Sequence, residues 1–205
     1  MSKGVLQFDM WGLDQAALET ADALDWDGLR QEIVAHGLRN SLLTAVMPTA
    51  STSIIMGSIA ESIEAIHSHV YVRRLLSGEV LACNKYLIRE LRARNLWSQD
   101  MLNRIIENNG SVEGFADVPD EIKRVYKTTW DISLKTMVGM ARDRGAFLDQ
   151  GQSTNVHIKI PTTNKLMTYH MLAWQSGLKT GMYYLRQQPA QRALQVVRAV
   201  NTLAT

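Results

Sequence analysis

Leu42-Leu43-Thr44-Ala45-Val46-Met47-Pro48-Thr49-Ala50-Ser51-Thr52-Ser53 is the stretch from which the fold class is predicted. Its first five residues form a short apolar run that ends before Pro48, and such a run predicts a buried strand. A hydroxyl-rich turn follows directly. Because strands that lead into an anion-binding turn are common in α/β proteins, the stretch favours an α/β fold.

The turn at 47–53 has two interpretations. It carries four hydroxyl groups and a run of backbone N–H groups, which together can hold a phosphate at a helix start. Serine and threonine at the same positions also serve as ordinary helix caps. The spacing alone leaves both interpretations open.

Size, charge and cysteine content narrow the function class. The chain has 205 residues, of which 46% are hydrophobic, enough for one domain with a sizeable core over 1–205. Its 22 basic and 20 acidic residues form no long run of one sign, which argues against a nucleic-acid or anionic membrane partner.

Neither a membrane span nor a secretory signal is visible in the sequence, so we expect a cytoplasmic protein. The one cysteine, Cys83, lies in an apolar stretch and cannot form an internal disulfide.

Apolar periodicity and turn residues predict the remaining elements. An extended lead-in reaches Trp11, and a first helix contains Ala16 to Ala21. Further helices are expected at 26–36, 85–94, 98–108, 126–144 and 165–176, and another helical region is expected to begin at 119–121. Strands are expected at 68–73, 79–82, 155–160 and 180–185, the first two forming a hairpin. A polar helix or tail is expected over 187–205.

Three polar clusters are weaker candidates for a site. His67 and His69 would lie on one face of a strand, but no third ligand is near them in the sequence, so we predict no metal site. Glu61 and Glu64 lie one helical turn apart, and nothing nominates either as a general acid or base. Arg39 and Asn40 precede the predicted strand and fit a structural role as well as a substrate contact.

Eight segments between residues 2 and 186 follow one another in the order of a known family. They are 2–11, 37–43, 47–53, 61–64, 73–79, 84–87, 144–150 and 177–186, including Met-Pro-Thr-Ala-Ser-Thr-Ser at 47–53 and Lys-Thr-Gly-Met-Tyr-Tyr-Leu-Arg at 179–186. With them the chain resembles the C-terminal part of the large, catalytic subunit of class I ribonucleotide reductases. The resemblance implies the C-terminal portion of a ten-stranded α/β barrel with peripheral helices and a short β-hairpin.

The resemblance also implies two sets of site residues. The family's matching loop holds the diphosphate of the ribonucleotide, which assigns phosphate binding to Thr49, Ala50, Ser51 and Thr52, with Ser53 as a lesser candidate. Tyr183 and Tyr184 match neighbouring stations of a proton-coupled radical relay. A tyrosine phenol has a pKa near about 10, so it is neutral at cellular pH and loses a proton together with its electron. Adjacent strand residues point to opposite faces, so contact between the two rings requires a local distortion, which Gly181 could permit.

The implied function is that of the C-terminal half of a split ribonucleoside-diphosphate reductase large subunit. Its expected partners are an N-terminal large-subunit piece, the small subunit and a ribonucleoside diphosphate. We expect no cofactor on this chain, because the radical source belongs to a separate metal-containing small subunit. The family's catalytic and reducing cysteines have no match here, and Ala65 stands where the family usually has proline. The alternatives are a non-catalytic relic or repurposed binding protein, and an independent nucleotide-binding module.

Overall fold

The computed structural model describes residues 2–13, 24–40, 42–76 and 78–188. The predicted helix at Ala16 to Ala21 and the part of the predicted 187–205 tail from 189 onward lie outside them, whereas Gln187 ends a strand. The chain divides into two compact units. The first unit comprises Met1–Pro48, Leu134–Val156 and Thr162–Tyr184, and the second comprises Thr49–Ser133, His157–Pro161 and Leu185–Thr205.

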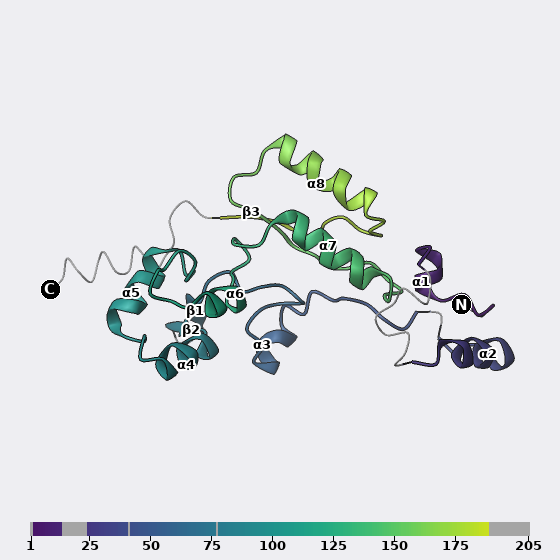
Figure 1. Cartoon of the computed structure of the whole chain (residues 1–205), viewed down its shortest axis with the longest axis horizontal. Coiled ribbons are helices and arrows are strands. Elements are labelled where there is room, and N and C mark those ends of the chain that lie inside the picture. The colour runs from purple at the N-terminus through teal and green to yellow at the C-terminus, as the bar shows by residue number, and fades with distance from the viewer. Residues whose placement is uncertain (1, 14–23, 41, 77, 189–205) are drawn as a thin grey trace. The chain divides into compact units, whose positions relative to one another are not determined.

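Helices and short strands are both present, as expected for an α/β fold, and the helices predominate (Figure 1). The helices are α1 (Gln7–Met10), α2 (Trp26–His36), α3 (Thr52–Met56), α4 (Lys85–Ala93), α5 (Gln99–Glu107), α6 (Asp120–Val125), α7 (Leu134–Gly145) and α8 (Thr163–Gln175). The strands are β1 (Val70–Leu75), β2 (Gly78–Cys83), β3 (Val156–Ile158) and β4 (Leu185–Gln187). None of the helices within the described ranges is long and apolar enough to cross a membrane.

Gln7–Met10 in the first unit form a short helix, so the predicted extended lead-in to Trp11 is wrong over these residues. The Asp9 carboxylate accepts the Leu6 N–H at 2.7 Å and thereby satisfies one of the unpaired donors at the start of α1. The same carboxylate receives two hydrogen bonds from the Arg30 guanidinium of α2, at 2.6 and 2.7 Å. Phe8 and Ile33 are buried between these elements. The tertiary contact of Asp9 with Arg30 therefore stabilises a helix that is too short for sequence periodicity to reveal.

The predicted buried strand at 42–46 is also wrong. Leu42 and Leu43 are 54% and 60% exposed, and Val46 alone makes a β-bridge, parallel to Gln152. The Asp149 carboxylate instead accepts the N–H groups of Leu43 at 2.7 Å and Thr44 at 3.1 Å. Because the N–H groups of Leu43 and Thr44 bond to a side chain and not to a neighbouring strand, the segment is extended but does not belong to a sheet.

Two helices of the first unit, α7 and α8, lie side by side (Figure 1). The helix predicted at 126–144 begins only at Leu134. In the second unit, the residues before it form a turn in which the N–H and hydroxyl of Thr128 donate to Asp131, at 2.9 and 2.7 Å. The Thr128 N–H is bonded within this turn and not within a helix. Apolar spacing does not reveal such a turn, so the predicted helix extends too far toward the N-terminus. The helix predicted at 165–176 is confirmed as α8, and Gly177 follows it with a positive φ of 74°.

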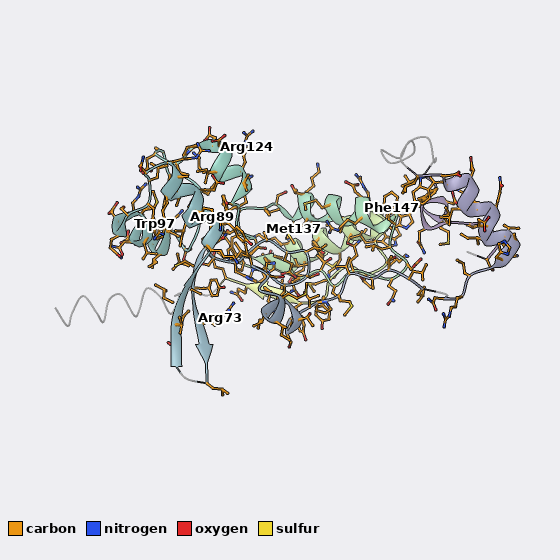
Figure 2. The ribbon with its side chains drawn as sticks, turned by 90° about the horizontal axis from the view of Figure 1, so that it is seen from below. Arg73, Arg89, Trp97, Arg124, Met137 and Phe147 are labelled. Carbon is orange, nitrogen blue, oxygen red and sulfur yellow. The ribbon has the colours of Figure 1, made fainter. Side chains whose placement is uncertain are left out.

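The second unit contains the predicted hairpin and the predicted helices after it. β1 and β2 pair antiparallel from Val70↔Cys83 to Leu75↔Gly78, and the hairpin extends away from the helices of the same unit (Figure 2). Asn84 caps α4 and Ser98 caps α5 through side-chain oxygens. The unit's core includes Leu87, Leu91 and Ile105, each at most 1% exposed. Burial of each such side chain contributes roughly 1.5–3 kcal/mol.

β3 and β4 pair in a second two-stranded sheet. The strand predicted at 155–160 is confirmed in its centre as β3. The strand predicted at 180–185 begins only at Leu185, because the chain bends at Gly181 and Tyr183. This bend places the two candidate tyrosines directly before β4.

Candidate functional site

Tyr183 and Tyr184 contact each other although they are adjacent in sequence. Their ring centroids are 4.5 Å apart and the ring planes meet at 73°, an edge-to-face arrangement. The side chains are accessible, since the two residues are 49% and 53% exposed. The bend at Gly181 and Tyr183 provides the local distortion that such a contact requires.

Main-chain hydrogen bonds fix the position of the tyrosine pair. The Tyr183 N–H donates to the Thr154 carbonyl, and the Tyr184 carbonyl accepts the Val156 N–H, both at 2.8 Å. Upstream, the buried hydroxyl of Tyr169 donates to the Gly181 carbonyl at 2.5 Å. Burial raises the pKa of Tyr169 to about 12, so this hydroxyl keeps its proton at neutral pH.

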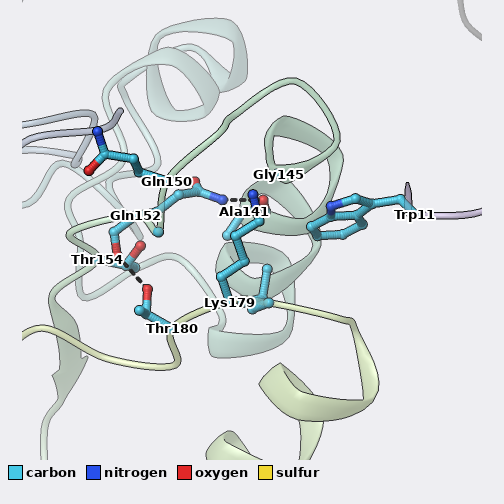
Figure 3. Close-up of a pocket in the computed structure, with 10 residues that line it drawn as sticks. Trp11, Ala141, Gly145, Gln150, Gln152, Thr154, Lys179 and Thr180 are labelled. Atoms are coloured by element: carbon cyan, nitrogen blue, oxygen red, sulfur yellow. Dashed lines mark hydrogen bonds between the residues drawn. The ribbon is translucent and has the colours of Figure 1, made fainter. Parts of the chain in front are cut away.

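Gln152 ties the segment that precedes Thr154 to α7 (Figure 3). Its side-chain amide donates to the Ala141 carbonyl at 2.6 Å, and its side-chain oxygen accepts the Arg144 Nε–H at 3.2 Å. Its main-chain carbonyl accepts the Thr180 hydroxyl at 3.2 Å. The adjoining pocket, lined also by Trp11, has room for about one water molecule, so it cannot hold a nucleotide.

The hydroxyl-rich turn lies in the second unit and leads into α3. Thr49 has a positive φ of 50°, and its hydroxyl accepts the Ser62 N–H at 2.7 Å. The Ser53 hydroxyl is buried and donates to the Ala50 carbonyl at 3.2 Å. These two hydroxyls therefore shape the turn.

Ser51 and Thr52 of this turn are exposed together with Ala50. Ser51 is the N-cap residue of α3, yet its side chain makes no capping hydrogen bond. The helix-cap interpretation of the turn therefore lacks its expected contact. The turn belongs to the second unit and the tyrosine pair to the first.

The two histidines considered from the sequence have different partners. His69 is buried, with Nε2 2.7 Å from the Tyr126 carbonyl and Nδ1 3.1 Å from the Asn84 side-chain nitrogen. Burial lowers its pKa, so it is neutral at pH 7. His67 instead contacts His157, with the two Nε2 atoms 3.0 Å apart, and Glu64 lies next to them. Sequence reasoning missed this group because His67 and His157 are 90 residues apart.

Cys83 is half-buried, and burial raises the pKa of its thiol. A raised pKa disfavours the thiolate, so Cys83 lacks the features of a reactive cysteine.

Comparison with known proteins gives one consistent result. Residues 1–184 match the family model described as ribonucleotide reductase, barrel domain. The chain is 47% identical over 205 residues to the ribonucleoside-diphosphate reductase large subunit of Caenorhabditis elegans. It is 48% identical over 195 residues to that of Danio rerio and over 194 residues to that of Vaccinia virus (strain Copenhagen). These matches cover 100%, 95% and 95% of this chain, and 25%, 24% and 24% of the relatives.

A solved structure shares the fold. The Actinobacillus ureae class Id ribonucleotide reductase alpha subunit superposes with a TM-score of 0.65 at 30% identity, covering 78% of this chain and 29% of that one. The chain spans about a quarter of the length of the curated relatives it matches. The chain therefore belongs to the ribonucleotide reductase barrel-domain family.

Proposed function

We propose that this chain supplies the C-terminal part of a ribonucleotide reductase large subunit, and so takes part in reducing ribonucleoside diphosphates to deoxyribonucleotides. The observation that carries the proposal is the exposed, edge-to-face pair of Tyr183 and Tyr184, whose ring centroids are 4.5 Å apart. In this proposal the two phenols pass a radical between them, each losing its proton as it loses an electron.

The anchoring of the pair supports this role. Electron transfer between neighbouring groups depends on a fixed separation, and the main-chain bonds to Thr154 and Val156 hold both residues in place. Their exposure leaves room for contact with a further redox partner. We propose that this partner is the small subunit, which would also carry the metal-containing radical source.

The turn at 49–53 is proposed to bind the substrate diphosphate. The hydroxyls of Ser51 and Thr52 and the backbone amides of the turn would take the phosphate oxygens. Thr49 and Ser53 would hold the turn in shape through the bonds to Ser62 and Ala50. Ala50 would contribute its backbone amide.

The remainder of the active site is proposed to come from the other three quarters of the large subunit. That part would complete a ten-stranded barrel to which this single C-terminal domain contributes its share. The hypothesis that it is a separate N-terminal chain, assembled with this one in the cytoplasm, is open to direct reconstitution.

The test measures ribonucleoside diphosphate reduction after this chain is mixed with the N-terminal large-subunit piece and the small subunit. Tyr183→Phe and Tyr184→Phe should each abolish turnover, because phenylalanine has no phenolic proton to lose. Tyr86→Phe is the matched control, since Tyr86 is 41% exposed and lies on α4. It should keep parental activity.

Two results would contradict the proposal. Turnover that survives Tyr183→Phe and Tyr184→Phe would refute the proposed role of the two tyrosines in a radical relay. A stable complex with no turnover would favour the non-catalytic binding role instead.

A further inference from the structure

Three metal-ligating side chains meet within the second unit. The ligand atoms of Glu64, His67 and His157 all lie within 4.8 Å of one another. The two imidazole Nε2 atoms are 3.0 Å apart, and His157 Nε2 is 3.8 Å from Glu64 Oε2. The cluster joins residues that are 90 positions apart in the sequence.

These separations are close to those around a tetrahedral metal ion. Zinc–nitrogen and zinc–carboxylate bonds of about 2.0–2.2 Å place neighbouring ligand atoms roughly 3.3–3.5 Å apart. The observed 3.0 and 3.8 Å lie on either side of that range. The third separation, between His67 and Glu64, is at most 4.8 Å, so the side chains would rotate to direct all three ligand atoms at one ion.

The burial of the three residues also fits a bound cation. The His157 side chain is fully buried and the Glu64 side chain is 6% exposed, whereas His67 is exposed. A cation would offset the cost of burying the Glu64 carboxylate, and the exposed His67 side gives an ion access from solvent. Two imidazoles and one carboxylate form the nitrogen and oxygen set that suits zinc and related transition metals.

The surrounding residues hold two of the ligands in place. The Trp130 indole N–H donates to the His67 carbonyl at 3.1 Å, and its ring packs edge-on against His157 with centroids 5.4 Å apart. The Thr129 N–H donates to the Ile66 carbonyl at 2.9 Å. The segment that carries His67 is thus fixed by a neighbouring segment independently of any ion.

We propose that Glu64, His67 and His157 form a binding site for a divalent transition-metal cation, of which Zn²⁺ is the natural probe. The site would cross-link the 64–67 segment to the 157–161 segment of the second unit. Three protein ligands leave a fourth position for water. The site uses none of the residues proposed for the radical relay or the phosphate turn.

The test is calorimetric titration of the full, tag-free chain with Zn²⁺ near neutral pH. We expect one ion per chain, with at least about tenfold weaker binding in His67→Gln, which removes one ligand at an exposed position. Co²⁺ provides a second readout, because its visible absorption reports nitrogen and oxygen coordination and should be lost in the same variant. Zn²⁺ should also raise the melting temperature of the parent chain but not that of His67→Gln.

His36→Gln is the matched control. His36 lies 3.6 Å from Glu32 on an exposed face of α2, a pair of one imidazole and one carboxylate. This variant should bind Zn²⁺ like the parent. Equal affinity in the parent and His67→Gln, or no uptake by a folded parent chain, would overturn the proposal and leave the His67–His157 contact as an N–H···N hydrogen bond.

Discussion

Replacing Gly145 with alanine should destabilise the first unit, whereas the same change at Gly139 in the same helix should stabilise it. A Cβ atom at Gly145 would lie 2.6 and 2.7 Å from two ring carbons of Trp11, closer than real Cβ atoms come. Overpacking of this kind costs typically about 1–3 kcal/mol. Gly145 is the last residue of α7, so the gain in helix propensity offsets only part of that cost. We expect a net loss of roughly 1–2 kcal/mol.

Gly139 provides the internal comparison for this change. Nothing lies within 4 Å of a Cβ atom at Gly139, so alanine there should gain roughly 0.5–1 kcal/mol from helix propensity alone. Urea unfolding measures both variants against the parent through the transition midpoint at unchanged slope. Two alanine substitutions in one helix should therefore shift the midpoint in opposite directions.

A double variant tests whether Trp11 is the cause. Trp11→Leu removes the ring carbons that the new methyl group would meet, so Gly145→Ala should cost less than about 0.5 kcal/mol in that background. A Gly145→Ala protein as stable as the parent would refute the packing of Trp11 on α7. If Gly145→Ala still costs roughly 1–2 kcal/mol in the Trp11→Leu background, the Trp11 ring is not the cause of the clash.

Three further predictions concern ionisation and capping. The pKa of Tyr169 is raised to about 12, so the buried neutral phenol contributes about 2–3 kcal/mol to stability below pH 10. This contribution is lost as the pH rises from 10 toward 12. Ultraviolet titration should show one phenol that ionises at unusually high pH, and Tyr169→Phe should remove that phase. The hydrogen bond from Arg104 lowers the pKa of Asp117 to about 2, so Asp117→Asn should cost stability above pH 4 and progressively less as the pH falls through about 2. Because Arg104 and Asp117 are 33% and 45% exposed, the loss should stay below about 1 kcal/mol in chemical unfolding. Ser98→Ala should cost about 1 kcal/mol, since the Ser98 hydroxyl caps α5 by accepting the Met101 N–H at 3.0 Å, and an unchanged melting temperature would contradict that.

Local signals in the sequence predicted the elements that depend on local contacts. Asn84 and Ser98 mark the starts of α4 and α5 through capping bonds to residues two or three positions away. Gly37 and Gly177 mark the ends of α2 and α8 with φ angles near 75°. These features require no knowledge of the rest of the chain.

The failures involve contacts between distant residues. The Asp149 carboxylate accepts the Leu43 N–H from 106 positions away, so the predicted strand is an extended segment outside any sheet. The residues of the candidate site divide in the same way: the bend required by Tyr183 and Tyr184 followed from their adjacency, whereas the approach of His157 to His67 had no local signal.

The anchoring of the tyrosine pair has a consequence for the engineering of these two positions. Thr154 and Val156 hold the pair through main-chain atoms, which every amino acid except proline supplies equally well. Folding therefore makes little demand on the side chains at positions 183 and 184, which are also about half exposed. These positions are natural places to install tyrosine analogues of altered reduction potential without rebuilding the scaffold.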